Sequence, residues 1–418
     1  MSANSLPWQR QILVCAASLV FSLAGHAADA AVARSGLAQA LEQAWRLNPQ
    51  AAALEAREAE ARAHRDIAAS LTPEPGSLSI GSRNDRLTRN LGKQEYEVEL
   101  AAPLWLPGQK AAREAEAASR VDEAGAKRAA LRSELAGELR DAWWALAGAR
   151  NAKALAARRL DTARALEADV RRRYKVGELS RIDANLAQSE VHAAGADLIE
   201  TEATLLQAEQ ALRTLTGTTA PQDMTEEVAT TRRTPSAALG TPETHPLLAA
   251  AAATARNARA KVTVADESRR AAPELALRVV RERGDFAEPY ANTVGIRLKI
   301  PFSSGAQVRR ESSAAQAEAN QADAEMLRTQ TRVQLEAERA QRALAAAERQ
   351  LAMAQERREL STENLRLSEK AFALGESDLA TLLRIRAAAF DAEAFLDRQR
   401  VARAAAISRL NQALGVLP

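Results

Sequence analysis

The sequence predicts a mostly α-helical fold with a small β part, arranged as two copies of one helical design. The first observation is composition: of 418 residues, 27% are charged, only 3% are aromatic, and nearly a quarter are alanine. This composition is typical of long helices that pack closely through small side chains. The second observation is proline spacing, because residues 108–220 and 302–417 contain no proline that would interrupt a helix.

The third observation is an internal repeat, seen when the sequence is compared with itself at a shift of 198 residues. Seven positions then match in residue or residue type: Pro75 with Pro273, Leu100 with Leu298, Pro103 with Pro301, Tyr174 with Phe372, Gly177-Glu178 with Gly375-Glu376, and Gly217 with Gly415. Asn48-Pro49 also falls on His245-Pro246 at a shift of 197. We therefore predict a first structural repeat over residues 31–217, an irregular linker over 218–244 and a second repeat over 245–418.

Both copies show the same order of elements. In the first we expect helices over 37–70, over 109–175 and from the following turn to 215, with strands over 77–82 and 94–104. In the second we expect helices from 245, over 306–373 and over 378–414, with strands over 274–282 and 290–300. The two shorter helices of each copy together match the long one, so they can stack end to end beside it. Between Val333 and Ala354, apolar residues are spaced alternately by four and three positions, and many of them are alanine. This spacing predicts a face along which another helix packs closely.

The first 30 residues are predicted to be a secretory signal peptide. Arg10 precedes an apolar run over Ile12–Ala24, and small residues suited to signal peptidase follow. This run, of about 13 residues, is too short to span a bilayer as a helix. It contains Cys15, the only cysteine of the chain, and the preceding Val14 does not fit a lipoprotein signal. We expect an exported protein without disulfides or transmembrane helices.

In the predicted strands over 94–104 and 290–300, apolar residues alternate with polar or small ones, so that charged residues fall on one face. The alternation fits two structures equally well: an outer-membrane barrel and a small soluble sheet with one packed face. In a barrel, a watery lumen would be faced by Glu97, Glu99, Arg297 and Lys299. The barrel is favoured by aromatic residues at the strand ends, typical of membrane surfaces: Trp105, Phe286, Tyr290 and Phe302. Because four strands cannot close a barrel, a dimer would have to supply eight or a trimer twelve.

Nothing in the sequence predicts catalysis, a cofactor or a metal site. The three histidines beyond the predicted signal, His64, His192 and His245, are widely separated, and no cysteine accompanies them. The 57 basic and 54 acidic residues are interspersed, and the net charge of +3 indicates no nucleic-acid partner. We expect a protein that is not an enzyme.

Four motifs carry a family resemblance. They are Leu37–Pro49 (LAQALEQAWRLNP), Ala101–Leu104 (AAPL) with Ile300–Phe302 (IPF), Arg173–Asp183 (RYKVGELSRID) and Ala371–Asp378 (AFALGESD). In this order, and duplicated, they resemble the TolC family of outer-membrane efflux channels over nearly all of the mature chain. The resemblance implies a homotrimer whose twelve-stranded β-barrel, four strands per chain, lies in the outer membrane above an α-barrel tunnel in the periplasm. It also implies passive conduction of substrates from a periplasmic adaptor (a membrane fusion protein) and an inner-membrane pump of the RND type.

The resemblance assigns roles to residues at the two helical turns, called here the tips. Docking to the adaptor is carried over to Val176, Gly177, Glu178, Leu179 and Ser180, and to Leu374, Gly375, Glu376 and Ser377. A plain helix break would explain the glycines alone. Candidate gating residues, acting as inter-helix ion pairs, are Arg181, Asp183, Asp378 and Arg384; ordinary solvated helix ends are the alternative. Where relatives often carry acidic residues, this chain has Thr381 and Arg384, which argues against cation binding at the entrance.

The alternative function is a soluble periplasmic coiled-coil scaffold or adaptor. An adaptor is expected to carry a single hairpin flanked by small β-rich domains, whereas this chain duplicates its helical design. The substrate is not readable from the sequence. The overall length and the short C-terminal end resemble members of the heavy-metal efflux branch.

Overall fold

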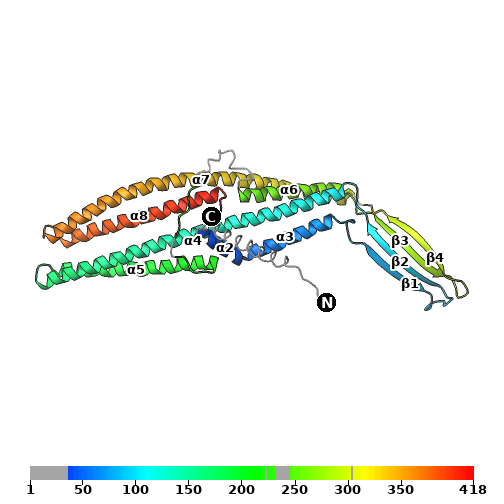
Figure 1. Ribbon diagram of the computed structural model, residues 1–418, viewed down its shortest axis with the longest axis horizontal. Coiled ribbons are helices and arrows are strands. Elements are labelled where there is room, and N and C mark those ends of the chain that lie inside the picture. The colour runs from blue at the N-terminus through cyan, green and yellow to red at the C-terminus, as the bar shows by residue number, and fades with distance from the viewer. Residues whose placement is uncertain (1–35, 222–223, 231–244, 303–304) are drawn as a thin grey trace, which may run out of the picture. The chain divides into compact units, whose positions relative to one another are not determined.

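The computed structural model describes residues 36–221, 224–230, 245–302 and 305–418 (Figure 1). The predicted signal peptide and much of the predicted linker lie outside the described residues. The chain divides into two compact units, one with residues up to Ala44, Leu139–Glu227 and Pro418, the other with Trp45–Glu138 and Val228–Leu417. The units cut across the two sequence repeats, so the repeat boundaries stay predictions.

The secondary structure is mostly helical with four strands, as predicted. In chain order the elements are α2 (Gly36–Leu47), α3 (Pro49–Ala68), β1 (Ser77–Asn84), β2 (Gln94–Pro103), α4 (Gln109–Lys175), α5 (Arg181–Thr216), α6 (Pro246–Glu267), β3 (Glu274–Arg283), β4 (Ala291–Lys299), α7 (Gly305–Ala373) and α8 (Leu379–Ala413). The long helices α4 and α7 have 67 and 69 residues. Within the described ranges, none of the helices has an apolar stretch long enough to cross a membrane.

The prediction of one helix over residues 37–70 is wrong, because two helices meet at Asn48. Pro49 has no N–H to donate and takes the first position of α3, while the Asn48 side chain accepts a hydrogen bond of 2.8 Å from the Gln50 amide. The same device begins α6, where Nδ1 of His245 accepts from the Leu247 amide at 3.2 Å and a proline follows. The match between Asn48-Pro49 and His245-Pro246 is therefore a repeated helix start.

In the larger unit, α6 and α8 both pack against α7. The predicted packing face is confirmed, since its buried positions on α7 are Val333, Ala337, Ala340, Ala347 and Ala354. The end of α8 meets the start of α6: a Cβ added to Gly415 would lie 2.6 Å from Cδ of Pro246. The two shorter helices of the second copy thus run end to end beside the long one, as their lengths predicted.

In the smaller unit, α5 packs along the part of α4 that follows Leu139. Leu160, Ala163 and Ala194 form a buried cluster between the two helices. Arg159 on α4 also pairs with Glu190 of α5 at 3.0 Å. Small side chains and cross-helix ion pairs together explain how two long, charged helices stay in contact.

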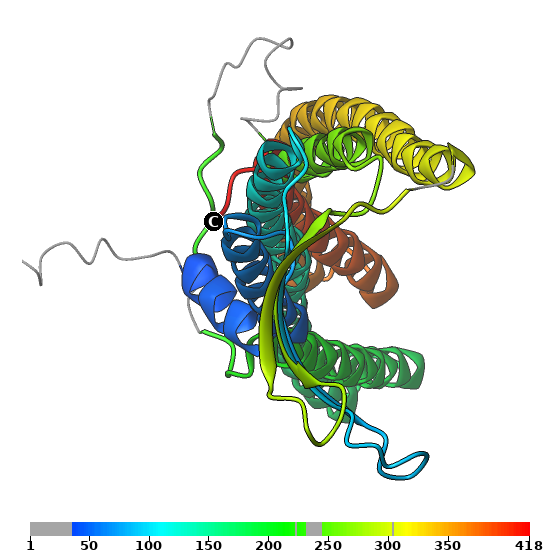
Figure 2. The same ribbon diagram turned by 90° about the vertical axis from the view of Figure 1, so that its right-hand side faces the viewer.

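The four strands form one antiparallel sheet in the order β1-β2-β3-β4, and its twist is visible in Figure 2. The central strands β2 and β3 belong to different repeats, yet they pair throughout, with Leu100 opposite Leu277. The outer strands β1 and β4 each have one edge without a partner strand in the described sheet.

Candidate functional site: two helical tips and a sheet

The first tip is the turn between α4 and α5, in the smaller unit. The Gly177 amide donates to the Tyr174 carbonyl at 3.0 Å, and the Glu178 amide donates to the Arg173 carbonyl at 2.9 Å. Gly177 has a φ of +84°, a conformation that side-chain-bearing residues rarely adopt. Val176 before it is 72% exposed. The turn therefore presents an apolar side chain to solvent beside an acidic one.

The second tip, between α7 and α8 in the larger unit, has the same hydrogen-bond pattern. The Gly375 amide donates to the Phe372 carbonyl at 3.2 Å, and the Glu376 amide donates to the Ala371 carbonyl at 2.9 Å. Gly375 has a φ of +77°, and Leu374 before it is 63% exposed. The recurrence of an exposed apolar residue, glycine and glutamate in both turns goes beyond what a plain helix break requires.

Each tip is followed by a capped helix start, but the two caps differ. At the first, the Asp183 amide donates to Oγ of Ser180 at 3.2 Å, and the Ser180 amide donates to the Asp183 carboxylate at 3.0 Å. At the second, Asp378 accepts a bond of 2.7 Å from the Thr381 amide. The pKa of Asp378 is lowered mainly by a hydrogen bond from the Thr381 side chain and, to a smaller extent, by the bond from the Thr381 amide. Because Thr381 stands where the first tip has Asp183, the reciprocal bond is absent there.

The four candidate gating residues are placed at these helix starts. Asp183 and Asp378 act as capping residues, while Arg181 and Arg384 are exposed. Cross-helix ion pairs in the two hairpins involve other residues of the described chain, such as Arg386 with Glu369 at 2.7 Å. That these four residues form inter-helix ion pairs that hold the tunnel shut therefore stays a prediction.

One face of the sheet carries most of its charged residues. Arg297 pairs with Glu99 at 3.0 Å, and Lys299 lies two residues further along the same face of β4. Glu97 pairs with Arg278 at 2.7 Å. Arg278 was not among the predicted lumen residues, although the alternation along β3 places it on this face. The predicted lumen residues thus share one face of the sheet, and several of them form ion pairs there. That this face lines a lumen stays a prediction.

The opposite face of the sheet is apolar and exposed. Its residues, 43% to 79% exposed, are Leu78, Ile80, Val98, Leu100, Leu275, Leu277, Val279, Val294, Ile296 and Leu298. They come from all four strands and lie opposite one another in the register, as Ile80 does to Val98 and Val279 to Val294. Exposed apolar surface of this extent marks a site of contact with lipid or protein.

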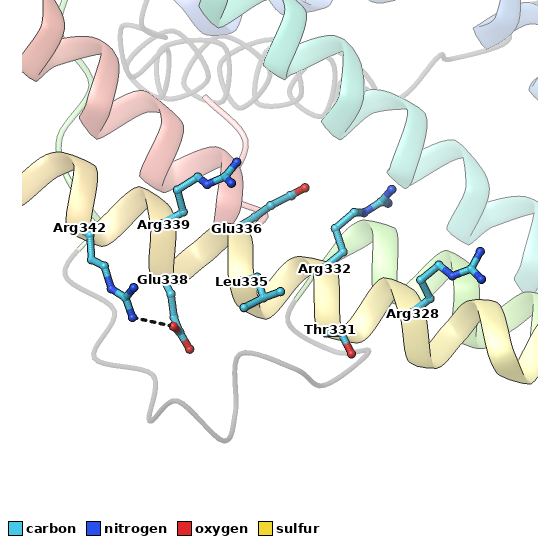
Figure 3. A pocket seen from close by; sticks show the side chains of 8 residues that line it. All are labelled: Arg328, Thr331, Arg332, Leu335, Glu336, Glu338, Arg339 and Arg342. Carbon is cyan, nitrogen blue, oxygen red and sulfur yellow. Dashed lines mark hydrogen bonds and ion pairs between the residues drawn. The ribbon is translucent and has the colours of Figure 1, made fainter.

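A shallow hollow lies on the surface of α7 (Figure 3). It is lined by Arg328, Thr331, Arg332, Leu335, Glu336, Glu338, Arg339 and Arg342. The carboxylate of Glu338 accepts a hydrogen bond from Arg342 at 3.1 Å, while Leu335 is 60% exposed. All of these residues belong to one helix, so the hollow is an open helix surface rather than an enclosed site.

Partly buried polar groups in the larger unit join helices. The Glu123 carboxylate on α4 accepts from Thr254 at 2.8 Å and from Asn257 at 2.6 Å, both on α6, and pairs with Lys127 at 2.6 Å. Burial acts to raise the pKa of Glu123, but these partners outweigh it and lower the pKa. Within the described ranges, no group of three or more His, Cys, Asp or Glu residues is arranged to hold a metal ion.

The sequence also matches a known protein family, and this family fits the tips, the duplicated hairpins and the amphipathic sheet. The model of the family described as Outer membrane efflux protein matches residues 36–218, the first repeat. Over these residues, the sequence matches the outer membrane efflux protein family. Among curated proteins, no match is found. The family assignment confirms the predicted TolC-like resemblance, the efflux role and the outer-membrane location, and a family of efflux proteins agrees with the prediction that the chain is not an enzyme.

Solved structures with similar folds cover nearly the whole chain. A membrane protein from Pseudomonas aeruginosa has a TM-score of 0.75 and 20% identity, over 91% of this chain and 93% of that one. CusC has a TM-score of 0.76 and 16% identity, over 91% and 92%. The open state of the Neisseria gonorrhoeae MtrE outer membrane channel has 0.72 and 17%, over 91% and 89%. At these identities the likeness concerns the fold, and it confirms long helical hairpins with four strands. The scores single out no branch of the efflux proteins, the heavy-metal branch included.

Proposed function

We propose that three copies of this outer membrane efflux protein form the channel of a tripartite efflux system. The channel passively conducts substrates from a periplasmic adaptor and an inner-membrane pump of the RND type to the exterior. The sheet carries the proposal, since one of its faces is apolar and exposed in all four strands. A soluble sheet of this size would cover such a face with other parts of the protein.

The edges of the sheet support the pooling of strands between copies. Backbone N–H and C=O groups along the free edges of β1 and β4 would be left without partners in the hydrocarbon region, where water is absent. Pairing β4 of one copy with β1 of the next removes both edges, and three copies supply twelve strands. The charged face with Glu97 and Arg278 then lines the aqueous lumen, and the apolar face meets lipid.

Exposed apolar residues on the long helices support assembly as well. On α7, Met353, Leu360 and Leu367 recur at heptad spacing and are 67%, 64% and 50% exposed. On α5, Ile199 and Leu206 are seven residues apart and are 70% and 56% exposed. Heptad stripes of this kind are usually covered by another helix. Neighbouring copies of the chain would cover them in a trimer.

The two tips are the proposed docking sites for the adaptor. Both present the same small set of groups: an exposed apolar residue, Val176 or Leu374, a glycine with positive φ, and a glutamate. An adaptor hairpin that contacts one tip would find equivalent chemistry at the other. Duplicated tips therefore suit a ring of similar adaptor subunits.

Cysteine cross-linking tests the assembly, because the only native cysteine lies in the predicted signal peptide. Ser79→Cys on β1 would be combined in turn with Thr293→Cys, Gly295→Cys and Arg297→Cys on β4. We expect at least one pair to give a covalent trimer in the outer-membrane fraction. Each single variant is the control and should stay monomeric on a denaturing gel. A soluble periplasmic monomer or dimer would overturn the channel and favour the scaffold.

Docking is tested by placing a charge at the tips without changing the glycines. In Val176→Asp with Leu374→Asp, we expect the trimer to form normally while adaptor cross-linking and efflux are lost. The matched control is Leu87→Asp, because Leu87 is fully exposed (100%) in the loop between β1 and β2. Equal loss in the control, or normal adaptor cross-linking in the tip variant, would contradict docking at the tips.

A further inference from the structure

Two arginines lie on the apolar face of the sheet, at the end where the hairpin loops begin. Two rows of that face contain Leu78, Leu100, Leu277 and Ile296, and then Ile80, Val98, Val279 and Val294. The next row toward the loops contains Ser82, Tyr96, Arg281 and Asn292. Arg283 follows two residues later on β3, on the same face. The apolar face therefore ends in a polar, basic and aromatic border at the loops.

Aromatic rings, rather than carboxylates, hold these two arginines. The Arg281 guanidinium lies 4.8 Å from the centre of the Tyr290 ring. That of Arg283 lies 4.9 Å from the same ring and 5.5 Å from the ring of Phe286, and its Nε donates to the Gly92 carbonyl at 3.2 Å. The Tyr290 hydroxyl, in turn, donates to the Gln94 side chain. The rings fix the guanidinium groups in place and leave their charge uncompensated.

The arginines of the opposite face, in contrast, have carboxylate partners. Arg83, Arg278 and Arg297 all form ion pairs with glutamates of β2, at distances from 2.7 to 3.5 Å. Arg281 and Arg283 have no carboxylate within 4.0 Å in the described part of the chain. In the proposed barrel these two cations border the lipid-facing surface, where an anion from outside the protein can reach them.

We propose that Arg281 and Arg283 bind the phosphate of a membrane-lipid headgroup at the outer rim of the barrel. The inference rests on the proposed function, in which the apolar face contacts the hydrocarbon of the outer membrane. A guanidinium is the best side chain for phosphate, because its planar donors match two phosphate oxygens. Tyr96 and Tyr290, with ring centres 6.5 Å apart, supply the amphipathic aromatic groups that lie at headgroup level. The lipid phosphate supplies the charge that the protein does not.

Lipid retention by the full-length protein tests this site. The protein would be extracted in a neutral detergent and exchanged into micelles doped with phosphatidic acid, whose headgroup is a bare phosphate. Diacylglycerol with the same acyl chains is the matched lipid without phosphate, and inorganic phosphate in undoped micelles is the matched phosphate without acyl chains. Native mass spectrometry of the oligomer would count the ligands that remain bound.

The double variant Arg281→Gln with Arg283→Gln would be compared with Arg83→Gln, which removes a cation from the opposite face near the same loops. We expect wild type and Arg83→Gln to retain phosphatidic acid selectively over diacylglycerol, and the double variant to retain about tenfold less. Equal retention by the double variant, or no preference over diacylglycerol, would overturn the site. If the wild type bound inorganic phosphate in undoped micelles as well as it binds phosphatidic acid, the lipid site would also be overturned, in favour of a site for free anions. A chain that does not form outer-membrane trimers at all would instead refute the proposed function, because retention is measured only on the isolated trimer.

Discussion

The guanidinium of Arg278 on β3 lies 2.7 Å from the carboxylate of Glu97 on β2. These residues belong to different sequence repeats, so the ion pair joins the repeats at the centre of the sheet. The same guanidinium is 3.6 Å from Glu95, a second carboxylate of β2. A single arginine thus contacts two acidic residues of the neighbouring strand, and the β2 and β3 backbones, paired along their lengths, hold this arrangement in place.

A double-mutant cycle of Arg278→Gln and Glu97→Gln should reveal a favourable coupling of about 1 kcal/mol. Both side chains are partly exposed, at 34% and 26%, so solvent screens the pair and a larger value is not expected. Urea unfolding of the detergent-solubilised protein measures it. The control cycle uses Arg328 and Glu325, a pair that is 80% and 58% exposed, for which we expect almost no coupling. Equal coupling in the two cycles would contradict the structural role of Arg278.

Removing one partner of the buried ion pair between Arg140 and Glu227 should have a larger effect. These side chains are only 2% and 8% exposed, with nitrogen and oxygen 2.7 Å apart. Glu227→Gln takes this carboxylate away from the buried Arg140 guanidinium, and breaking a buried ion pair typically costs about 3 to 5 kcal/mol of unfolding free energy. Glu338→Gln, which breaks the exposed pair with Arg342, is the control and should change stability by less than about 0.5 kcal/mol. A small effect for Glu227→Gln would show that the pair is solvated in solution.

Alanine at Gly177 or Gly375 should destabilise the tips through backbone strain alone. Nothing lies within 4 Å of an added Cβ at either position, but both residues have positive φ, of +84° and +77°. The expected loss is about 1 kcal/mol for each change. In contrast, Gly125→Ala, within α4 and also without a neighbour within 4 Å, should stabilise the helix by up to about 1 kcal/mol. Thermal unfolding distinguishes the two signs, and a stabilising Gly177→Ala would refute the strain.

Stability should fall in mildly acidic solution because of His245. Burial lowers the pKa of His245 below 6.5, assisted by the positive charge of Arg332. Below pH 6.5 the unfolded chain therefore binds the proton more readily than the folded one, and the neutral histidine's contribution is lost as the pH falls toward the folded pKa. His245→Asn keeps a cap acceptor, as Asn48 does in the first repeat, without titrating. We expect this variant to lose less stability than wild type between about pH 7 and pH 5; parallel pH profiles would contradict the role of His245.

The sequence by itself was sufficient to determine the features that depend on local chemistry. Helix content follows from composition and proline spacing, the tips from Gly177 and Gly375, and the two faces of each strand from alternation. The break at Asn48 was also readable, since a capping residue followed by proline recurs in both repeats, as Asn48-Pro49 and His245-Pro246. The family motifs added the efflux role, because they recur in order along the chain.

Only the tertiary structure decided which residues meet across the sheet. The register of β2 and β3 brings together segments far apart in the chain, and a shift of one residue would send every side chain to the other face. This register pairs Arg278 with Glu97 and leaves Arg281 and Arg283 beside Tyr290, on the apolar side. Alternation could assign these arginines to faces, but their partners depend on strand pairing and loop positions, which local sequence preferences do not specify.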